Sequence, residues 1–164
     1  MIKIGFGDID IFDNRKSRSI WSVKGKVYFK GTAFIGHGSK INVGANGSVT
    51  FGKNFTITAE SSIVCNKCIN FGNDNLLSWD VLIMDDDFHN ILDSQQNIIN
   101  NPNDITIGNW VWIGCRSLIL KGSNIPSNSI IAAGSLVSKK LTEENSIYGG
   151  NPIAIIKKEI HWEK

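Results

Sequence analysis

The C-terminal half of this sequence repeats every six residues, and this repeat limits the folds available to the chain. The aliphatic positions of the repeat are Ile107, Ile113, Ile119, Ile125, Ile131 and Val137. Four residues after each lies a second series, in which serine dominates: Val111, Ser117, Ser123, Ser129, Ser135 and Leu141. An amphipathic helix places apolar residues three or four apart, so this spacing excludes it. Because six is an even number, the repeat agrees with the two-residue alternation of a β-strand.

A six-residue unit also determines how the strands assemble. It leaves room for about four strand residues and a two-residue turn, and it cannot bury its apolar side by itself. The units must therefore stack, which predicts a parallel β-solenoid rather than a sandwich. The composition supports this fold, because 26 isoleucines favour strands while 18 asparagines and 16 glycines favour tight turns.

The repeat continues upstream with interruptions. One phase covers residues 51–63, and a second phase, displaced by two residues, covers 71–83. Between His89 and Asp104 the repeat stops, and the intervening residues are polar and rich in asparagine. We expect the stretch 89–104 to be a loop extruded from the solenoid, and loops on rigid scaffolds are favoured places for function.

No shift in composition divides the chain, so we expect a single domain over residues 1–164. Within it we expect an N-terminal cap at 1–30, a β-helix at 31–142 and a C-terminal cap at 143–164. The first cap lacks the repeat and carries many charges, and terminal repeats need a polar or differently shaped cover. The residues that follow Pro152 are expected to form a short helix or an extension.

Composition and charge exclude several other classes of protein. No stretch approaches the roughly 18 apolar residues of a membrane-spanning helix, and the N-terminal residues lack the pattern of a signal peptide. Three cysteines argue against a disulfide framework, so we expect a cytoplasmic protein. The net charge of +2 is too balanced to indicate a nucleic-acid partner.

Three segments of the chain carry recognisable motifs. They are IGNWVWIG at 107–114, IAAGSLVSK at 131–139 and GGNP at 149–152. In order and spacing these segments resemble the hexapeptide-repeat acyltransferases, over about residues 35–158. The run LSWDVLI, which leads into DDDFH at 85–89, is most similar to bacterial polysaccharide O-acetyltransferases.

The resemblance implies an all-β fold, a left-handed parallel β-helix with three six-residue units in each coil. It also implies acetyl-CoA as cosubstrate, and a homotrimer with each active site in a cleft between neighbouring subunits. The implied reaction is direct transfer of an acetyl group to a sugar hydroxyl of a surface polysaccharide or its precursor.

His89 is the candidate general base. An alcohol is a poor nucleophile at neutral pH, and a neutral imidazole is the usual group that takes its proton. His89 lies where the repeat gives way to the extruded loop, and the resemblance assigns the base to the histidine at this position. The alternative is a solvated loop histidine. His37 and His161 are weaker candidates, because one lies in an irregular early coil and the other near the C-terminal end of the sequence.

The acidic run before His89 supplies a candidate to orient its imidazole. A carboxylate that accepts a hydrogen bond from the second ring nitrogen fixes the tautomer of a catalytic histidine. If the strand runs on, Asp85 and Asp87 face the same way as His89, and we favour Asp87. A solvated acidic loop is one alternative. A divalent metal site is another, but one histidine and a carboxylate run are no ligand set, so we expect no metal.

The resemblance also implies where CoA binds. Trp112 lines the channel for the pantetheine arm, and the backbone N–H of Cys115 faces the developing oxyanion. Gly114 lets the backbone approach closely. The other candidates for cofactor contact are Ala132, Ala133, Ser138 and Lys139. A surface aromatic residue at a subunit interface is the alternative interpretation of Trp112.

Candidates for acceptor binding precede the base. Trp79 offers a face for a sugar ring, although a buried core tryptophan is about as plausible. Asp80 and Asn75 are the accompanying polar candidates.

Cys65 and Cys68 form a C-x-x-C pair without a second pair to complete a zinc site, so we interpret both as wall residues.

Two other functions remain open at this point. An N-acyltransferase acting on an amino sugar would use the same base and the same CoA channel. A non-catalytic β-helix scaffold, or a relative of the gamma-type carbonic anhydrases, would need neither. The carbonic anhydrase type requires three histidines that converge, whereas the three histidines of this chain, at 37, 89 and 161, lie too far apart in the sequence to do so.

Overall fold

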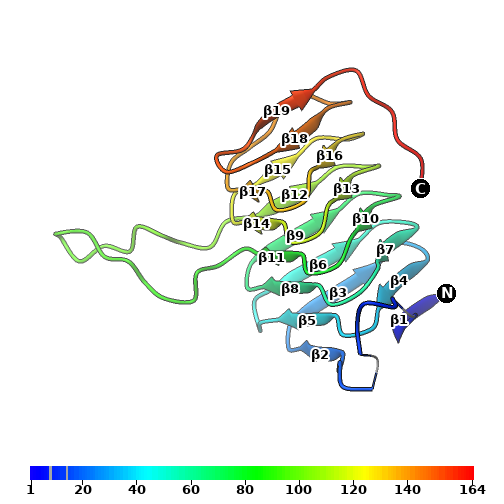
Figure 1. The fold of residues 1–164 in the computed structure, drawn as a ribbon. Coiled ribbons are helices and arrows are strands. Elements are labelled where there is room, and N and C mark those ends of the chain that lie inside the picture. Colours follow the sequence, from blue (N-terminus) through cyan, green and yellow to red (C-terminus); the bar gives the residue numbers. More distant parts are fainter. Residues whose placement is uncertain (8, 14) are drawn as a thin grey trace.

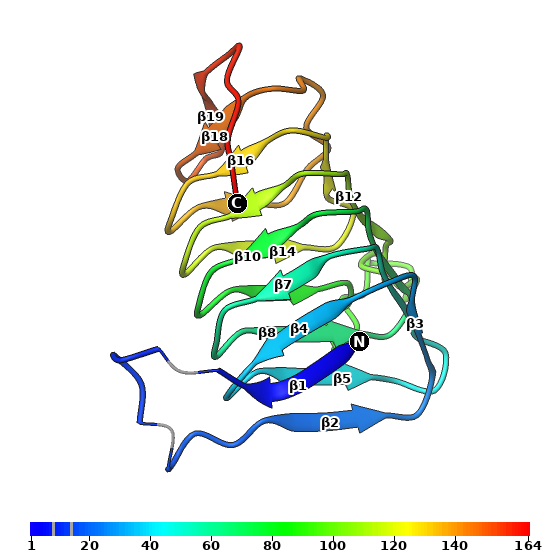
Figure 2. The same ribbon diagram turned by 90° about the vertical axis from the view of Figure 1, so that its right-hand side faces the viewer.

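In the part of the chain that the structure describes, nineteen short strands form three sheets, which are the three faces of a parallel β-helix (Figures 1 and 2). The computed structural model describes residues 1–7, 9–13 and 15–164. No helix is present among these residues, and so none is long and apolar enough to cross a membrane. The expected all-β solenoid is confirmed.

Sheet A has eight strands and contains the strand that opens each coil. In spatial order they are β1 (Ile2–Phe6), β4 (Ala33–Gly36), β7 (Phe55–Ile57), β10 (Leu76–Leu77), β13 (Trp112–Ile113), β16 (Ile130–Ile131), β18 (Ile147–Gly149) and β19 (Ala154–Lys157). All neighbours pair in parallel except β18 and β19, which are antiparallel.

The other two faces are built in the same way. Sheet B consists of β2 (Ile20–Val23), β5 (Lys40–Val43), β8 (Ser62–Cys65), β11 (Leu82–Met84), β14 (Leu118–Leu120) and β17 (Leu136–Val137). Sheet C consists of β3 (Lys26–Phe29), β6 (Ser48–Phe51), β9 (Cys68–Phe71), β12 (Ile105–Ile107) and β15 (Asn124–Ile125). Strand pairing therefore begins inside the expected N-terminal cap, because β1, β2 and β3 belong to the three sheets.

Inward side chains stack in columns along the axis, and these columns form the core. The column of sheet A is Ile35, Ile57, Leu77, Ile113, Ile131 and Tyr148. Every member of this column is buried. The aliphatic position of the six-residue repeat is thus the position that faces the axis.

The serines of the repeat are buried at the corners between faces. There the Ser117 hydroxyl donates to the carbonyl of Ala132 at 3.1 Å, and the Ser135 hydroxyl donates to the same carbonyl at 2.6 Å. The Ser123 hydroxyl donates to the carbonyl of Leu120 at 2.6 Å. These bonds give each of these buried hydroxyls a partner and tie the corners to neighbouring backbone carbonyls.

The coils shorten from the N-terminal end to the C-terminal end, and the stack narrows accordingly (Figure 2). In the wider part, the coil that separates the paired residues Ile35 and Ile57 is longer than three repeat units. Near the C-terminal end, Ile113 pairs with Ile131, and the coil between them is three repeat units long. Aromatic rings fill the wider coils, where Phe29, Phe51 and Phe71 stack at centroid distances of 5.1 and 5.4 Å.

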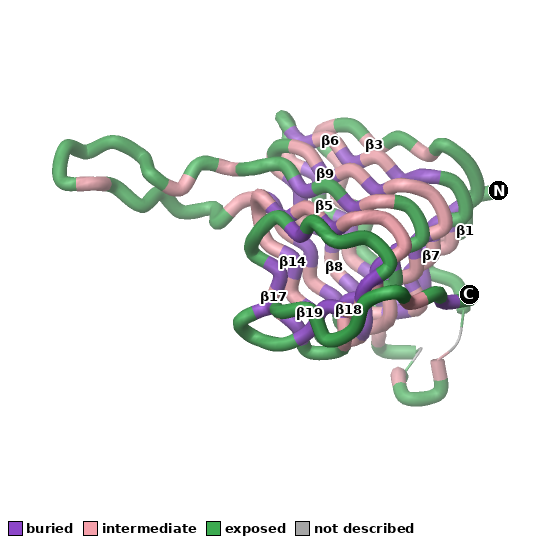
Figure 3. The backbone as a smooth tube through the Cα atoms, turned by 90° about the horizontal axis from the view of Figure 1, so that it is seen from above, coloured by how far each residue is buried: buried purple, intermediate pink, exposed green. Residues whose placement is uncertain are grey.

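The expected loop is confirmed between β11 and β12, over residues 85–104. It projects sideways from the β-helix, and most of its residues are exposed (Figures 1 and 3). Near its tip, Leu92 and Ile98 form an isolated antiparallel bridge. Of the two forms expected after Pro152, the extension is the one found, because β19 leads into an extended segment that ends at Lys164.

Candidate active site

A groove of about 290 Å³ runs across three successive coils at the corner between sheets A and B. Its lining residues follow β10, β13 and β16 or lie in the last two of these strands: Ser78, Trp79, Trp112, Gly114, Cys115, Ile130, Ile131, Ala132 and Ala133. The parallel register pairs Leu77 with Ile113 and Ile113 with Ile131, so the residues after them stack directly. The structure therefore brings together six of the predicted site residues: Trp79, Trp112, Gly114, Cys115, Ala132 and Ala133.

The backbone of the groove is held by the ladder between coils. The N–H of Gly114 donates to the carbonyl of Ile131 at 2.8 Å, and the N–H of Gly134 donates to the carbonyl of Cys115 at 2.9 Å. A Cβ on Gly114 would lie 2.6 Å from the nitrogen of Ala133, so only glycine fits between these coils. Among the described residues, the N–H of Cys115 has no hydrogen-bond acceptor, and it borders the groove.

The two tryptophans of the groove are held differently. Trp112 is 37% exposed, and its indole N–H donates to the Ser78 hydroxyl at 3.1 Å. The ring of Trp162 packs against it at a centroid distance of 6.0 Å. Trp79 is half-buried in the same lining. Trp112 is not a core residue, because its neighbour Ile113 occupies the column of the axis. Trp79 lies in the corner after β10 and is not part of the buried core.

The polar candidates for acceptor binding lie outside the lining. Asp80 is exposed at the corner after β10, where its carboxylate lies 3.9 Å from the Arg116 guanidinium. Asn75 is fully buried before β10, at the opposite end of the strand. Its amide oxygen accepts from the N–H of Val111 at 2.8 Å and its amide nitrogen donates to the carbonyl of Gly72 at 3.1 Å. The bond from Val111 joins two coils, and the bond to Gly72 closes the local turn, so both groups of the Asn75 amide are occupied.

Ser138 and Lys139 also lie apart from the groove. They are exposed after β17, at the corner between sheets B and C. Lys139 borders a separate hollow of about 190 Å³ beside Tyr148 and Ile153. The predicted phosphate contact is therefore not part of the pocket that Trp112 lines within one chain.

His89 is exposed on the extruded loop, which leaves the β-helix at the corner between sheets B and C. Asn100 donates from its amide nitrogen to the carbonyl of His89 at 2.8 Å, and its amide oxygen accepts from the N–H of Ile91 at 2.7 Å. One asparagine on the returning arm thus holds the backbone that directly follows His89, on both sides of Asn90. Within one chain, His89 does not line the groove, because the two lie at different corners.

Asp87 has partners other than the imidazole of His89. Its carboxylate accepts a hydrogen bond from the ammonium of Lys121, and another from the amide nitrogen of Asn100 at 2.8 Å. The hydrogen bond from Lys121, followed by that from Asn100, holds the pKa of Asp87 below its ordinary value. Lys121 also donates to the carbonyl of Asn100 at 2.6 Å, so the three side chains join both arms of the loop to the next coil.

Asp85 anchors the foot of the loop. Its buried carboxylate accepts from the N–H groups of Asn66 and Lys67 at 2.7 and 2.9 Å, and from the thiol of Cys65 at 3.1 Å. Burial, together with the hydrogen bond to Asp85, raises the pKa of the Cys65 thiol to about 12. On the returning arm, the N–H of Asn103 donates to the carbonyl of Asp85 at 3.0 Å.

The remaining candidates have structural environments. His37 is 5% exposed inside the wall, and Phe12 packs edge-on against its ring at 5.9 Å. His161 is exposed in the C-terminal extension. Cys65 and Cys68 lie in β8 and β9, within the wall. In the part of the chain that the structure describes, no three histidine, cysteine or acidic residues cluster as a metal site.

Sequence reasoning missed three residues of this region. Asn100 and Lys121 hold the loop that carries His89, and Trp162 contacts Trp112. The only signal for Lys121 is its place two residues after Ile119, at a corner of a regular coil. No signal marks Asn100, because it is one of several asparagines in the polar stretch 89–104.

Comparison with known proteins yields a consistent set of relatives. No family model matches the chain. A polysialic acid O-acetyltransferase of Escherichia coli O1:K1 is 36% identical over 118 residues, which are 71% of this chain and 38% of the relative. The galactoside O-acetyltransferase of Escherichia coli strain K12 is 32% identical over 126 residues, 76% of this chain and 57% of the relative. The chain thus spans only 38% and 57% of the length of these curated relatives.

Solved structures agree with these sequence matches. The crystal structure of the polysialic-acid-specific acetyltransferase NeuO has a TM-score of 0.68 and 30% identity, covering 84% of this chain and 71% of that one. A galactoside acetyltransferase in complex with coenzyme A has a TM-score of 0.66 and 26% identity, covering 82% of this chain and 64% of that one.

Proposed function

Because the chain belongs to the hexapeptide-repeat acetyltransferases, whose left-handed parallel β-helix it shares, we propose that it transfers an acetyl group from acetyl-CoA to a hydroxyl of a saccharide. The groove formed by Trp112, Cys115 and Ala133 carries this proposal. It combines an apolar channel with a backbone N–H that has no other acceptor among the described residues.

The residues of the groove suit the pantetheine arm and thioester of acetyl-CoA. The Trp112 ring and the methyl groups of Ala132 and Ala133 supply apolar walls for an extended chain. The N–H of Cys115 is positioned by the ladder rather than by a side chain, so it needs no rearrangement to stabilise negative charge on a carbonyl oxygen. Ser138 and Lys139 are the proposed contacts for the distal phosphates, which a lysine binds as a point charge.

His89 is the proposed general base. In its neutral form the imidazole takes the proton of the acceptor hydroxyl while the oxygen attacks the thioester carbonyl, and the protonated imidazole later returns the proton to the leaving thiolate. The acetyl group then moves from sulfur to oxygen in one transfer, without a covalent enzyme intermediate. Asp87 and Asn100 would act on this step by fixing the backbone that carries His89.

The separation of His89 from the groove supports a homotrimer. One chain holds the loop and the groove at different corners, so a cleft between two subunits is where a loop from one chain meets the groove of its neighbour. The loop offers exposed apolar side chains for such a contact, including Phe88, Ile91 and Ile99.

The proposed acceptor is a saccharide of a surface polysaccharide or its precursor. Trp79 presents its ring at the groove, and an indole beside polar groups is suited to stack on a sugar face. Asp80 lies next to it at the exposed corner and is the proposed hydrogen-bond acceptor for sugar hydroxyls. The relatives named above as polysialic acid and galactoside O-acetyltransferases support transfer to oxygen rather than to nitrogen.

Calorimetry with CoA tests the proposed function. We expect micromolar binding by the wild type and at least a tenfold loss in Trp112→Ala, since an aromatic wall of the groove is removed. Trp21→Ala is the matched control, because Trp21 is exposed on β2, far from the groove. Wild-type protein that fails to bind either CoA or acetyl-CoA would contradict the proposal. Binding would justify a screen of sugars by release of free thiol.

A further inference from the structure

The segment that follows β19 turns back along the outer face of sheet A (Figure 2). The N–H of Ile160 donates to the carbonyl of Asn145 at 2.9 Å, and the indole N–H of Trp162 donates to the carbonyl of Trp110 at 3.0 Å. Residues 158–164, which we call the tail, therefore pass from the last coil to earlier ones. The proposed function assigns no role to this tail.

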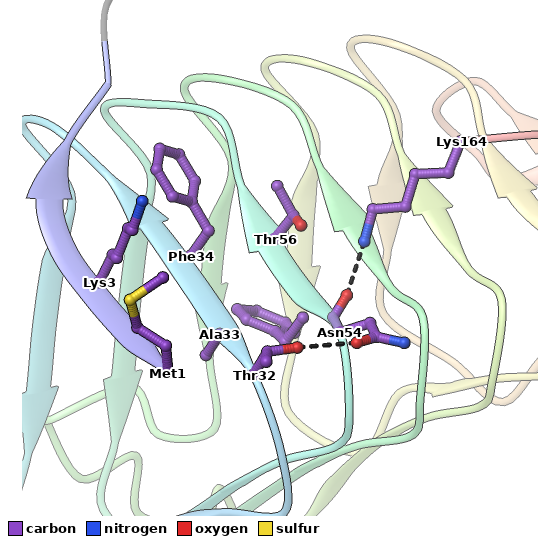
Figure 4. Close-up of a pocket in the computed structure, with 9 residues that line it drawn as sticks. Met1, Lys3, Thr32, Ala33, Phe34, Asn54, Thr56 and Lys164 are labelled. Atoms are coloured by element: carbon purple, nitrogen blue, oxygen red, sulfur yellow. Dashed lines mark hydrogen bonds between the residues drawn. The ribbon is translucent and has the colours of Figure 1, made fainter.

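Lys164 fastens the far end of the tail. Its ammonium donates to the carbonyl of Asn54 at 2.6 Å and lies 3.4 Å from the carbonyl of Asn75, so it bonds to two successive coils. Figure 4 shows this ammonium pointing at Asn54, at the rim of a hollow of about 310 Å³ beside Phe34. Burial lowers the pKa of Lys164, as expected for an ammonium that leaves water to bond to backbone carbonyls.

Between these two attachments, three tryptophans form one cluster. Trp162 is only 8% exposed, and its ring lies 5.9 Å from the ring of Trp110 and 6.0 Å from that of Trp112. The tail therefore does more than cover apolar surface, because one of its side chains reaches a residue that lines the groove. Trp162 contacts the tryptophan that lines it, on a ring whose indole N–H is already held by Ser78.

We propose that Trp162 is a positioning residue, which holds the ring of Trp112 in the wall of the groove and thereby sets the affinity for the CoA thioester. This inference rests on the proposed function. Ser78 holds Trp112 at its indole nitrogen, and Trp162 packs against its ring at an interplanar angle of 42°. A side chain ordered before binding does not have to be ordered by the ligand, which improves affinity. Trp162 does not line the groove, so it affects binding and leaves the chemical step unchanged.

The test compares CoA affinity among three variants by calorimetry. In Trp162→Ala we expect the dissociation constant for CoA to rise by about 3- to 10-fold, the range that corresponds to loss of one aromatic pair. Trp162→Phe keeps a ring against Trp112 and should remain within about twofold of the wild type. Trp21→Ala removes another tryptophan, one that stacks on Phe29 at 6.3 Å, and should leave the affinity unchanged.

Two further measurements separate positioning from general destabilisation. The KM for acetyl-CoA should rise in Trp162→Ala while kcat changes by less than about twofold, because only binding of the cosubstrate is affected. Without any cofactor, the indole N–H resonance of Trp112, identified by its absence in Trp112→Phe, should shift and exchange faster with solvent in Trp162→Ala. Circular dichroism checks that this variant is folded.

The outcomes distinguish this inference from the proposed function. Wild-type affinity and an unchanged Trp112 resonance in Trp162→Ala would overturn the positioning role, and the groove would remain a CoA site. A wild type that binds no CoA would overturn the proposed function and, with it, the claim about affinity. A fall in kcat with an unchanged KM would also contradict the inference, because Trp162 would then act on the chemical step.

Discussion

The wall of the groove and the loop that carries His89 are stabilised by different kinds of contact. Gly114, Cys115 and their neighbours are held by backbone hydrogen bonds between coils and by a column of buried aliphatic side chains. The loop has one isolated bridge, and side chains such as Asn100 and Lys121 attach it to the next coil. The repeated coils therefore form the binding surface, whereas individual side chains of the loop and the next coil position the proposed base.

This difference separates stability from activity. A column residue supports several coils at once, so its loss weakens the fold and the groove together. A loop residue has few buried contacts, so its loss affects position and chemistry with little cost in folding free energy. Variants of column residues should therefore lower the free energy of unfolding. Variants of loop residues should lower activity and leave the free energy of unfolding nearly unchanged.

The largest effect is expected at His89. His89→Ala should lower kcat by roughly 10²- to 10⁴-fold, because the acceptor hydroxyl loses its general base. The melting temperature should stay unchanged, since His89 is exposed. Steady-state turnover and thermal unfolding measure the two quantities. Asn90→Ala, an exposed neighbour on the same loop, is the control, and near-wild-type turnover in His89→Ala would exclude the assigned role.

A column residue should show the reverse signature. Ile113 is fully buried, and Ile113→Ala should lower the free energy of unfolding by about 2–5 kcal/mol through lost burial and the remaining cavity. Denaturant titration measures this value. Ile98→Ala serves as the matched variant on the loop, where loss of the exposed side chain should cost less than about 0.5 kcal/mol. Equal losses at the two sites would contradict the comparison.

Asp85 lies where the loop joins the wall, so its loss should both lower the free energy of unfolding and loosen the loop. Asp85→Ala leaves the buried N–H groups of Asn66 and Lys67 without their acceptor, which should cost about 1–3 kcal/mol. Hydrogen exchange should also accelerate across the loop, whose foot this carboxylate anchors. Ser94→Ala, at the exposed loop tip, is the control. Unchanged exchange between residues 86 and 104 would show that the foot does not hold the loop.

The smallest effect concerns pH. Because the folded pKa of Asp87 lies below its ordinary value, its contribution to loop order is complete above the ordinary value. This contribution is lost as the pH falls through the depressed folded value. In Lys121→Met the pKa of Asp87 should rise, so the loop should loosen at a higher pH than in the wild type. A carboxyl titration by NMR measures the shift, and identical titrations of the two proteins would remove Lys121 as its cause.

The wall could be predicted from the sequence because every coil repeats the same local rule. Ile113 and Ile131 stand in a period that is visible without a structure, and Gly114 lies where two coils approach closely. The loop follows no such rule. The expectation that Asp87 faces His89 assumed a strand that continues, but β11 ends at Met84 and the alternation ends with it. Asp87 pairs instead with residues whose proximity depends on the path of the loop.

The tail was beyond prediction for the same reason. Trp162 meets Trp110 across 52 positions of sequence, and no periodic pattern links the two. Its neighbours are determined by the direction in which the chain turns after β19, which depends on packing against sheet A. The residues that sequence reasoning missed are thus those whose contacts bridge unrelated segments, whereas the residues of the column repeat their contacts from coil to coil.

The return of the tail across the coils has a consequence for the order of assembly. Ladder partners such as Ile113 and Ile131 are separated by a single coil, but Lys164 reaches Asn54 across 110 positions. A chain that leaves the ribosome N-terminus first can add each coil to the one already formed. The tail can dock only after the last coil is complete. Trp112 therefore acquires Trp162 as a neighbour only after residues 158–164 have been synthesised, later than its contacts within the wall.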